Sequence, residues 1–220
     1  MPIDADKSTF YPCCSQIVCR GCIYANMISN RHDKAKAFSC PFCREPAPDK
    51  EEFDQKMMKR VQANDPATLC QMGIICKKDG DHDGAFEYWT KAAELGDVEA
   101  HCRLGYMYMN EEGVEKDEEM KVYHLEKAAI GGHPIARHVL ALTEEKNGNM
   151  ERAVKHYIIA AKVGYELSMK TLWKHYSLGN ITKEDLDATL RSHQTAIDEM
   201  KSEQRDAKSI GALVSTMLVD

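Results

Sequence analysis

Residues 91–96 read Lys-Ala-Ala-Glu-Leu-Gly, and related segments follow at 127–132 (Lys-Ala-Ala-Ile-Gly-Gly) and at 159–164 (Ile-Ala-Ala-Lys-Val-Gly). The glycines that end these segments are 36 and 32 residues apart. A second series of residue pairs has spacings of 32, 36 and 32: Met72-Gly73, Leu104-Gly105, Leu140-Ala141 and Leu172-Trp173. Periods of this length are typical of helix-turn-helix units that stack into a solenoid. The sequence therefore predicts a mostly α-helical fold, an α-solenoid of helix-turn-helix repeats.

The repeat positions suggest how the units pack. Small residues at fixed places allow the two helices of a unit to approach closely, and the terminal glycines favour helix ends because glycine adopts left-handed backbone conformations. Asp65-Pro66 is a helix-start signal. We expect the repeats to span residues 65–182, followed by a capping helix and tail over 183–220. Because no unit can bury its apolar stripe alone, stability should come from contacts between neighbouring units.

These segments resemble the Sel-like repeat, a relative of the tetratricopeptide repeat, with the pattern Ala-x-x-x-Leu-Gly-x-x-Tyr, Gly-Val-x-x-Asp and Lys-Ala-Ala-x-x-Gly. The unit over 100–132 matches nearly throughout, including Gly-Val-Glu-Lys-Asp at 113–117. Its neighbours lack four residues in that loop, and Trp173 replaces the glycine of the last unit. The resemblance implies a solenoid whose concave face binds protein partners, and it implies no catalytic residue.

Composition narrows the class of protein. The 220 residues carry a net charge of −6, and 43% of them are hydrophobic, as in ordinary globular chains. An acidic balance disfavours a nucleic-acid surface, because phosphate contact needs clustered Lys and Arg. No segment approaches the roughly 18–20 apolar residues of a membrane span, and residues 1–6 lack the pattern of a secretory signal. We expect a cytoplasmic or nuclear protein that is not secreted and binds neither membranes nor nucleic acid.

Six of the nine cysteines lie within the first 43 residues: Cys13, Cys14, Cys19, Cys22, Cys40 and Cys43. The last four form two Cys-x-x-Cys knuckles, in which backbone N–H groups point at the sulfurs and both thiolates reach one metal ion. Thiols stay reduced inside cells, so dense cysteines there indicate metal before disulfides. The sequence predicts that these six cysteines bind Zn²⁺ in a small module over 1–48, which a helical connector over 49–64 joins to the repeats.

The cysteine pattern is similar to a RING finger of the all-cysteine type, in which ligand pairs interleave between two zinc ions. The resemblance implies that Cys13, Cys14, Cys40 and Cys43 form one site and that Cys19 and Cys22 form half of another. It also implies partner-binding roles for Pro41, within the last pair, and for Arg44, where such ligases place a cation that bridges the ubiquitin-conjugating enzyme and ubiquitin. A RING positions the conjugating enzyme and is not itself a chemical catalyst.

One RING ligand pair is missing from the sequence, because no Cys-x-x-Cys precedes Cys13. One explanation is that such a pair lies upstream of Met1. Otherwise one zinc site is complete, and the other holds water, recruits a ligand such as His32 or is empty. Two functions stay open at this point. The protein is either a ubiquitin-ligase-type adaptor whose repeats recruit a protein partner, or a scaffold in which zinc is purely structural.

Overall fold

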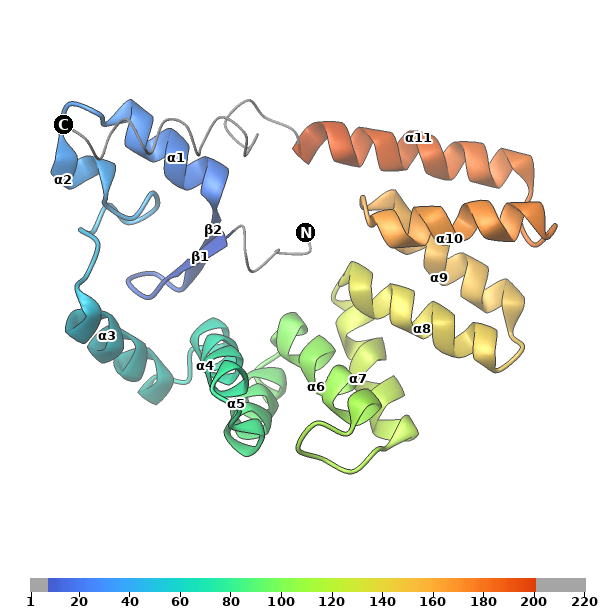
Figure 1. Ribbon diagram of the computed structural model, residues 1–220, viewed down its shortest axis with the longest axis horizontal. Helices are drawn as coiled ribbons and strands as arrows, with labels where there is room; N and C mark the ends of the chain where they lie inside the picture. Colours follow the sequence, from blue (N-terminus) through green and yellow to red (C-terminus); the bar gives the residue numbers. More distant parts are fainter. Residues whose placement is uncertain (1–7, 201–220) are drawn as a thin grey trace. The chain divides into compact units, whose positions relative to one another are not determined.

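The computed structural model describes residues 8–200, which form two compact units over 8–68 and 69–199 (Figure 1). Residues 1–7 and 201–220, which include the tail expected after the capping helix, lie outside the described residues. Within 8–200, no helix combines the length and the apolar character that crossing a bilayer requires.

A short hairpin and three helices make up the first unit. Strands β1 (Ser8–Tyr11) and β2 (Gln16–Cys19) pair antiparallel, with Ser8 opposite Cys19 and Tyr11 opposite Gln16. Helices α1 (Arg20–Ser29), α2 (Lys34–Ala37) and α3 (Lys50–Gln62) follow. Side-chain caps set the helix starts: the Cys19 sulfur accepts the N–H of Cys22, and Asp33 and Asp49 act in the same way at α2 and α3.

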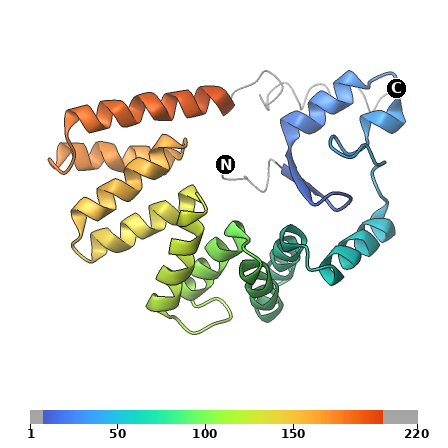
Figure 2. The same ribbon diagram turned by 180° about the vertical axis from the view of Figure 1, so that it is seen from behind.

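The second unit is an array of helices, most of which pack on the next helix along the chain (Figure 2). In chain order the helices are α4 (Pro66–Lys78), α5 (His82–Glu94), α6 (Val98–Asn110), α7 (Glu118–Ile130), α8 (Pro134–Lys146), α9 (Met150–Lys162), α10 (Glu166–Ser177) and α11 (Lys183–Met200). The predicted helix-turn-helix array is therefore confirmed. Residues 111–117 connect α6 to α7, whereas three residues connect α4 to α5 and α8 to α9, so the four extra residues of the longer repeat lie in this loop.

Small residues at the repeat positions let neighbouring helices touch. The paired alanines near the ends of α5, α7 and α9 are buried: Ala92, Ala93, Ala128, Ala129, Ala160 and Ala161. A Cβ added at Gly105 would lie 2.8 Å from Cγ of Leu125, and one at Gly73 would lie 2.4 Å from Nε1 of Trp89. The fully buried Trp89 donates this N–H to the carbonyl of Cys70 at 3.1 Å. Glycine at positions 73 and 105 is thus required by close packing.

The C-terminal end of the array departs from this pattern. Trp173, which stands where earlier repeats have a small residue, is 49% exposed, and its ring meets Tyr176 edge-on at 6.5 Å. Helix α11 covers the C-terminal end of the apolar core through its own buried side chains. Leu186 is buried in one cluster with Tyr157 and Leu172, and Nδ1 of His193 lies 2.8 Å from the carbonyl oxygen of Ala161 in α9.

Two histidines meet inside the repeat array. Nδ1 of His101 lies 3.0 Å from Nδ1 of His124, and the ring of Tyr108 stacks on His124 with centroids 5.8 Å apart. Burial, together with the neighbouring charge of His101, lowers the pKa of His124 to about 4. Burial also lowers the pKa of His101. The array therefore holds this pair in the neutral form.

We predict that the repeat array loses stability in mild acid. The unfolded chain binds a proton at His124 near pH 6.5, whereas the folded chain does so only near pH 4. The contribution of neutral His124 to the free energy of unfolding is therefore fully present above pH 6.5 and is lost as the pH falls toward 4. Urea unfolding followed by circular dichroism should show a loss of about 1–2 kcal/mol from this group between pH 7.5 and pH 5.

The variant His124→Gln should remove this part of the pH dependence, because glutamine does not titrate. The exposed His32 in the first unit offers a matched control, and His32→Gln should keep the wild-type profile. Identical pH profiles for wild type and His124→Gln would show that burial of His124 does not set acid sensitivity.

Candidate metal centre

Four sulfur atoms come together in the first unit. The Sγ atoms of Cys13, Cys14, Cys40 and Cys43 all lie within 4.8 Å of one another, and those of Cys14 and Cys40 are 3.6 Å apart. A tetrahedral zinc ion with bonds of about 2.3 Å has sulfur–sulfur edges of about 3.8 Å. The donor set and its spacing therefore fit a tetrahedral site for Zn²⁺.

Two tight turns position the four sulfurs. Cys13 and Cys14 lie in the turn between β1 and β2, where Ser15 has a left-handed backbone (φ 54°). Cys40 and Cys43 follow α2, in a turn closed by two backbone hydrogen bonds: the N–H of Cys40 donates to the Glu45 carbonyl at 2.8 Å, and the N–H of Arg44 donates to the Cys40 carbonyl at 3.0 Å. Segments far apart in the sequence thus supply two sulfurs each.

The local electrostatics differ among the four thiols. Burial raises the pKa of Cys13 well above its usual range, and the neighbouring sulfur of Cys43 adds to this effect. Burial, followed by the contact with Cys40, raises the pKa of Cys14 to about 11. Burial opposes ionisation of Cys40, but hydrogen bonds from the backbone N–H groups of Cys43 and Phe42 and from the Cys14 and Cys13 thiols together lower the pKa of Cys40. A zinc ion would supply the positive charge that allows the other thiols to ionise.

Cys19 and Cys22 lie apart from this cluster, at the start of α1. The N–H of Cys22 donates to the Cys19 sulfur at 3.4 Å, as expected for a knuckle. Across residues 8–200, no second group of three or more His, Cys, Asp or Glu ligand atoms gathers as closely as the four sulfurs. The proposed alternative ligand His32 is exposed and accepts a hydrogen bond from Nε of Arg31 at 3.1 Å. Ligation by Cys19 and Cys22 stays a prediction.

Arg60 of α3 supports the cluster, and sequence reasoning missed it. Its Nε donates to the carbonyl of Pro12 and its Nη2 donates to that of Cys13, both at 2.5 Å. A second contact joins α3 to the other cysteine turn, since Nζ of Lys56 lies 2.8 Å from a carboxylate oxygen of Glu45. Residues 49–64, expected as a connector, thus belong to the same compact unit as the cysteines. Because Arg60 binds backbone carbonyls, which every residue has, no pattern of side chains in the sequence could have identified it.

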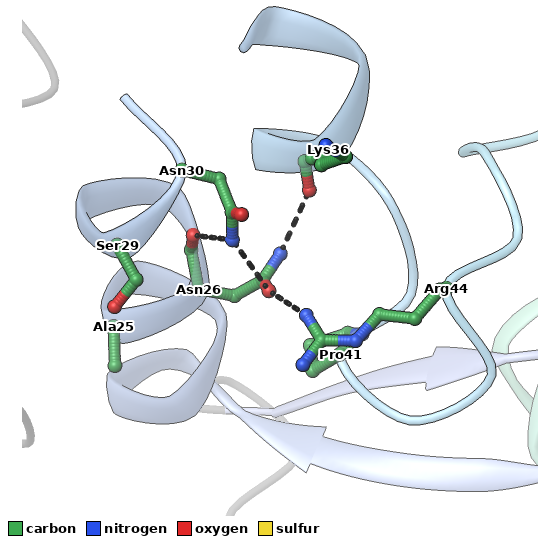
Figure 3. Close-up of a pocket in the computed structure, with 7 residues that line it drawn as sticks. All are labelled: Ala25, Asn26, Ser29, Asn30, Lys36, Pro41 and Arg44. Atoms are coloured by element: carbon green, nitrogen blue, oxygen red, sulfur yellow. Dashed lines mark hydrogen bonds between the residues drawn. The ribbon is translucent and has the colours of Figure 1, made fainter. Parts of the chain in front are cut away.

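Asn26 of α1 connects the second cysteine turn to the rest of the unit (Figure 3). Its buried side chain donates Nδ2–H to the carbonyls of Lys36, Ala37 and Ser39, each at 3.2 Å. Its Oδ1 accepts from Nη1 of Arg44 at 2.9 Å and from Nδ2 of Asn30 at 3.2 Å. Sequence reasoning did not single out Asn26 either.

A cavity of about 620 Å³ opens beside this network, and we call it the α1 cavity (Figure 3). Its lining residues come from α1, α2 and the second cysteine turn: Ala25, Asn26, Ser29, Asn30, Lys36, Pro41 and Arg44. The two residues predicted to bind a partner, Pro41 and Arg44, therefore line the same cavity.

Comparison with known proteins identifies the repeats. Residues 67–97, 98–133 and 144–165 match the family model of the Sel1 repeat. Chitin synthase regulatory factor 4 of Schizosaccharomyces pombe is 30% identical over 86 residues, which are 39% of this chain and 14% of that protein. The chain therefore contains Sel1 repeats, as its resemblance to the Sel-like repeat predicted, and its match spans about a seventh of the yeast relative.

Two solved structures share the repeat fold. A Sel1 repeat protein from Oxalobacter formigenes is 29% identical, with a TM-score of 0.50, and the match covers 55% of this chain and 96% of that one. The antigen c5321 of uropathogenic Escherichia coli, described as displaying an SLR fold, is 21% identical, with a TM-score of 0.53, and the match covers 74% and 36%. Both support a Sel1 solenoid.

We predict one zinc ion per chain at the four-sulfur cluster. Cys40→Ser should abolish stoichiometric zinc in reduced full-length protein, because it removes the most buried ligand of the four. Cys76→Ser, in the repeat array, should leave the zinc content unchanged. Metal analysis after dialysis measures the content, and the intensity of the thiolate charge-transfer band after Co²⁺ substitution counts the ligands. Wild-type zinc content in Cys40→Ser would exclude the assigned cluster.

We also predict that Arg60 strengthens metal binding through the turn that it holds. Arg60→Gln removes the two donors to the carbonyls of Pro12 and Cys13, and should lower zinc affinity about tenfold, as is typical when groups that orient ligands are removed. Competition with a chromophoric chelator measures the affinity. Lys59→Gln, at an exposed neighbouring position, is the control. Equal affinities for the two variants would contradict a supporting role for Arg60.

Proposed function

We propose that this protein is a protein-interaction adaptor, in which the Sel1 repeats bind one protein partner and a zinc-folded head, residues 8–68, binds another. The observation that carries the proposal is the convergence of four cysteine sulfurs in a unit separate from the repeat array. Sel1 repeats favour a scaffolding role, and the yeast relative is named as a regulatory factor. The proposal assigns no catalytic residue.

The repeat array carries a row of exposed apolar residues suited to a protein partner. Leu95, Ile130 and Val163 lie at the ends of α5, α7 and α9 and are 49%, 79% and 48% exposed. Leu95 and Val163 hold the same repeat position and Ile130 lies one residue earlier in its repeat, so all three side chains lie at the C-terminal ends of equivalent helices in the stacked array. Repeated apolar groups at an edge favour contact with an extended protein surface. We call these three residues the repeat row.

Zinc would have a structural role in the head. Few apolar side chains are buried within residues 8–68, namely those of Phe10, Pro12, Val18, Ala37 and Met57, beside Cys40. A unit of this size buries too little apolar surface to be stable alone, so small domains commonly depend on a metal or on disulfides. Metal binding and folding of the head should therefore be coupled.

A ubiquitin-ligase adaptor is the second candidate, and one observation favours it. Pro41 and Arg44, which the RING resemblance assigns to contact with a conjugating enzyme, both line the α1 cavity beside the second cysteine turn. In this version the head would position a conjugating enzyme that carries ubiquitin, while the repeats hold the substrate. Its contribution to the reaction would be orientation and electrostatic stabilisation.

The adaptor proposal predicts two separable sets of bound proteins. Full-length, zinc-loaded protein should capture both sets from a cell extract, as quantified by mass spectrometry. Cys40→Ser should lose the head-bound set because the head no longer holds zinc. A triple variant of the repeat row, with serine at positions 95, 130 and 163, should lose the other set because its apolar contacts are gone.

Retention of every captured protein by both variants would contradict the adaptor proposal. The same preparations test the second candidate when they are incubated with ubiquitin-charged conjugating enzymes. Ubiquitin discharge that falls in Arg44→Ala would support the ligase adaptor, whereas absence of discharge with intact protein capture would favour the scaffold.

A further inference from the structure

The α1 cavity has a cationic wall. Its only charged lining side chains are those of Arg44 and Lys36, and no acidic residue lines it. Nζ of Lys36 is paired with Asp33 at 3.1 Å, in an exposed ion pair. Arg44 has no such partner, since none of the ion pairs within residues 8–200 includes it. The guanidinium is therefore the positive group that is available to a ligand in this cavity.

The guanidinium of Arg44 is also held in place. Nη1 donates to Oδ1 of Asn26, which is itself fixed by three backbone carbonyls. The backbone of Arg44 is left-handed (φ 63°), and its N–H is bonded to the Cys40 carbonyl. Holding an arginine in advance reduces the entropy lost when it binds. An arginine has five N–H donors in a planar fork, so the bond to Asn26 leaves donors for a carboxylate or a phosphate.

We propose that the α1 cavity binds an anionic side chain of a protein partner, a carboxylate or a phosphate, through the guanidinium of Arg44. Ala25 and Pro41 would contact the apolar part of that side chain, and Ser29 and Asn30 add polar groups at the wall. This inference rests on the proposed function, because it specifies the chemistry of the partner that the head would bind.

The charge of the metal cluster opposes this attraction without cancelling it. Four thiolates around Zn²⁺ carry a formal charge of −2. None of the four cysteines lines the cavity, whereas the guanidinium does. Backbone N–H groups of Phe42 and Cys43 also stabilise negative charge on Cys40. A ligand in direct contact with Arg44 therefore meets the cation first, and Coulomb attraction falls with distance.

Peptide binding to the full-length, zinc-loaded chain tests the inference. The probes are three fluorescein-labelled peptides of one sequence in which the central residue is glutamate, phosphoserine or glutamine, and fluorescence anisotropy gives the affinity. We expect the glutamate or the phosphoserine peptide to bind at least about tenfold more tightly than the glutamine peptide. The anionic peptide that binds more tightly shows whether the cavity prefers a carboxylate or a phosphate.

Variants then locate the site. Arg44→Gln should weaken binding of the anionic peptide about tenfold, and Ser29→Asp should do the same by placing a carboxylate at the cavity wall. Arg31→Gln changes an exposed arginine that does not line the cavity, and should bind as wild type does. Zinc content and circular dichroism of each variant verify that the head is folded.

The inference is overturned if all three peptides bind equally, if none binds, or if Arg44→Gln with full zinc content keeps wild-type affinity. These outcomes are distinguishable from failure of the adaptor proposal. If the cavity binds no anion but Cys40→Ser still loses a set of captured proteins, the head is an interaction module with another recognition surface.

Discussion

The cost of ionising four closely spaced thiols without a cation is the constraint on which the proposed head depends. Their sulfurs lie within 4.8 Å of one another, and burial makes ionisation of Cys13 and Cys14 unfavourable without a cation. The turn after β1 and the turn after α2 meet at these sulfurs, and Arg60 and Asn26 hold one turn each. A cation at the cluster would favour the ionised thiolates, and their bonds to it would then hold the two turns together.

The repeat array depends on a different kind of contact, and this difference matters for stability. Many of its helices touch their neighbours through buried alanines and through glycines that leave no room for a Cβ, as at Gly105 against Leu125. Stability then accumulates from interfaces between adjacent repeats, whatever the state of the cysteines. Loss of metal should therefore unfold the head and leave the array intact, so the chain should not unfold in a single two-state transition.

Much of the fold could be predicted from the sequence because its signals are local and periodic. The small residues of the repeats, such as Gly73 and Gly105, recur at fixed spacing and mark where helices touch. The resemblance to a RING finger implied that Cys13, Cys14, Cys40 and Cys43 would group together, and their sulfurs do lie close to one another. Arg60 and Asn26 could not be found in this way, because they bind backbone carbonyls that any sequence supplies. Only the three-dimensional arrangement shows which carbonyls they reach.

The position of Arg44 would couple the proposed metal binding of the head to its proposed partner binding. Arg44 directly follows Cys43 of the four-sulfur cluster, and its backbone N–H is bonded to the carbonyl of Cys40, another cysteine of that cluster. The guanidinium reaches Asn26 only while that turn keeps its shape. A partner that requires Arg44 in this position must therefore bind the metal-loaded head more tightly than the metal-free head. Thermodynamic linkage then requires that the same partner tighten the hold of the cluster on its metal by an equal factor.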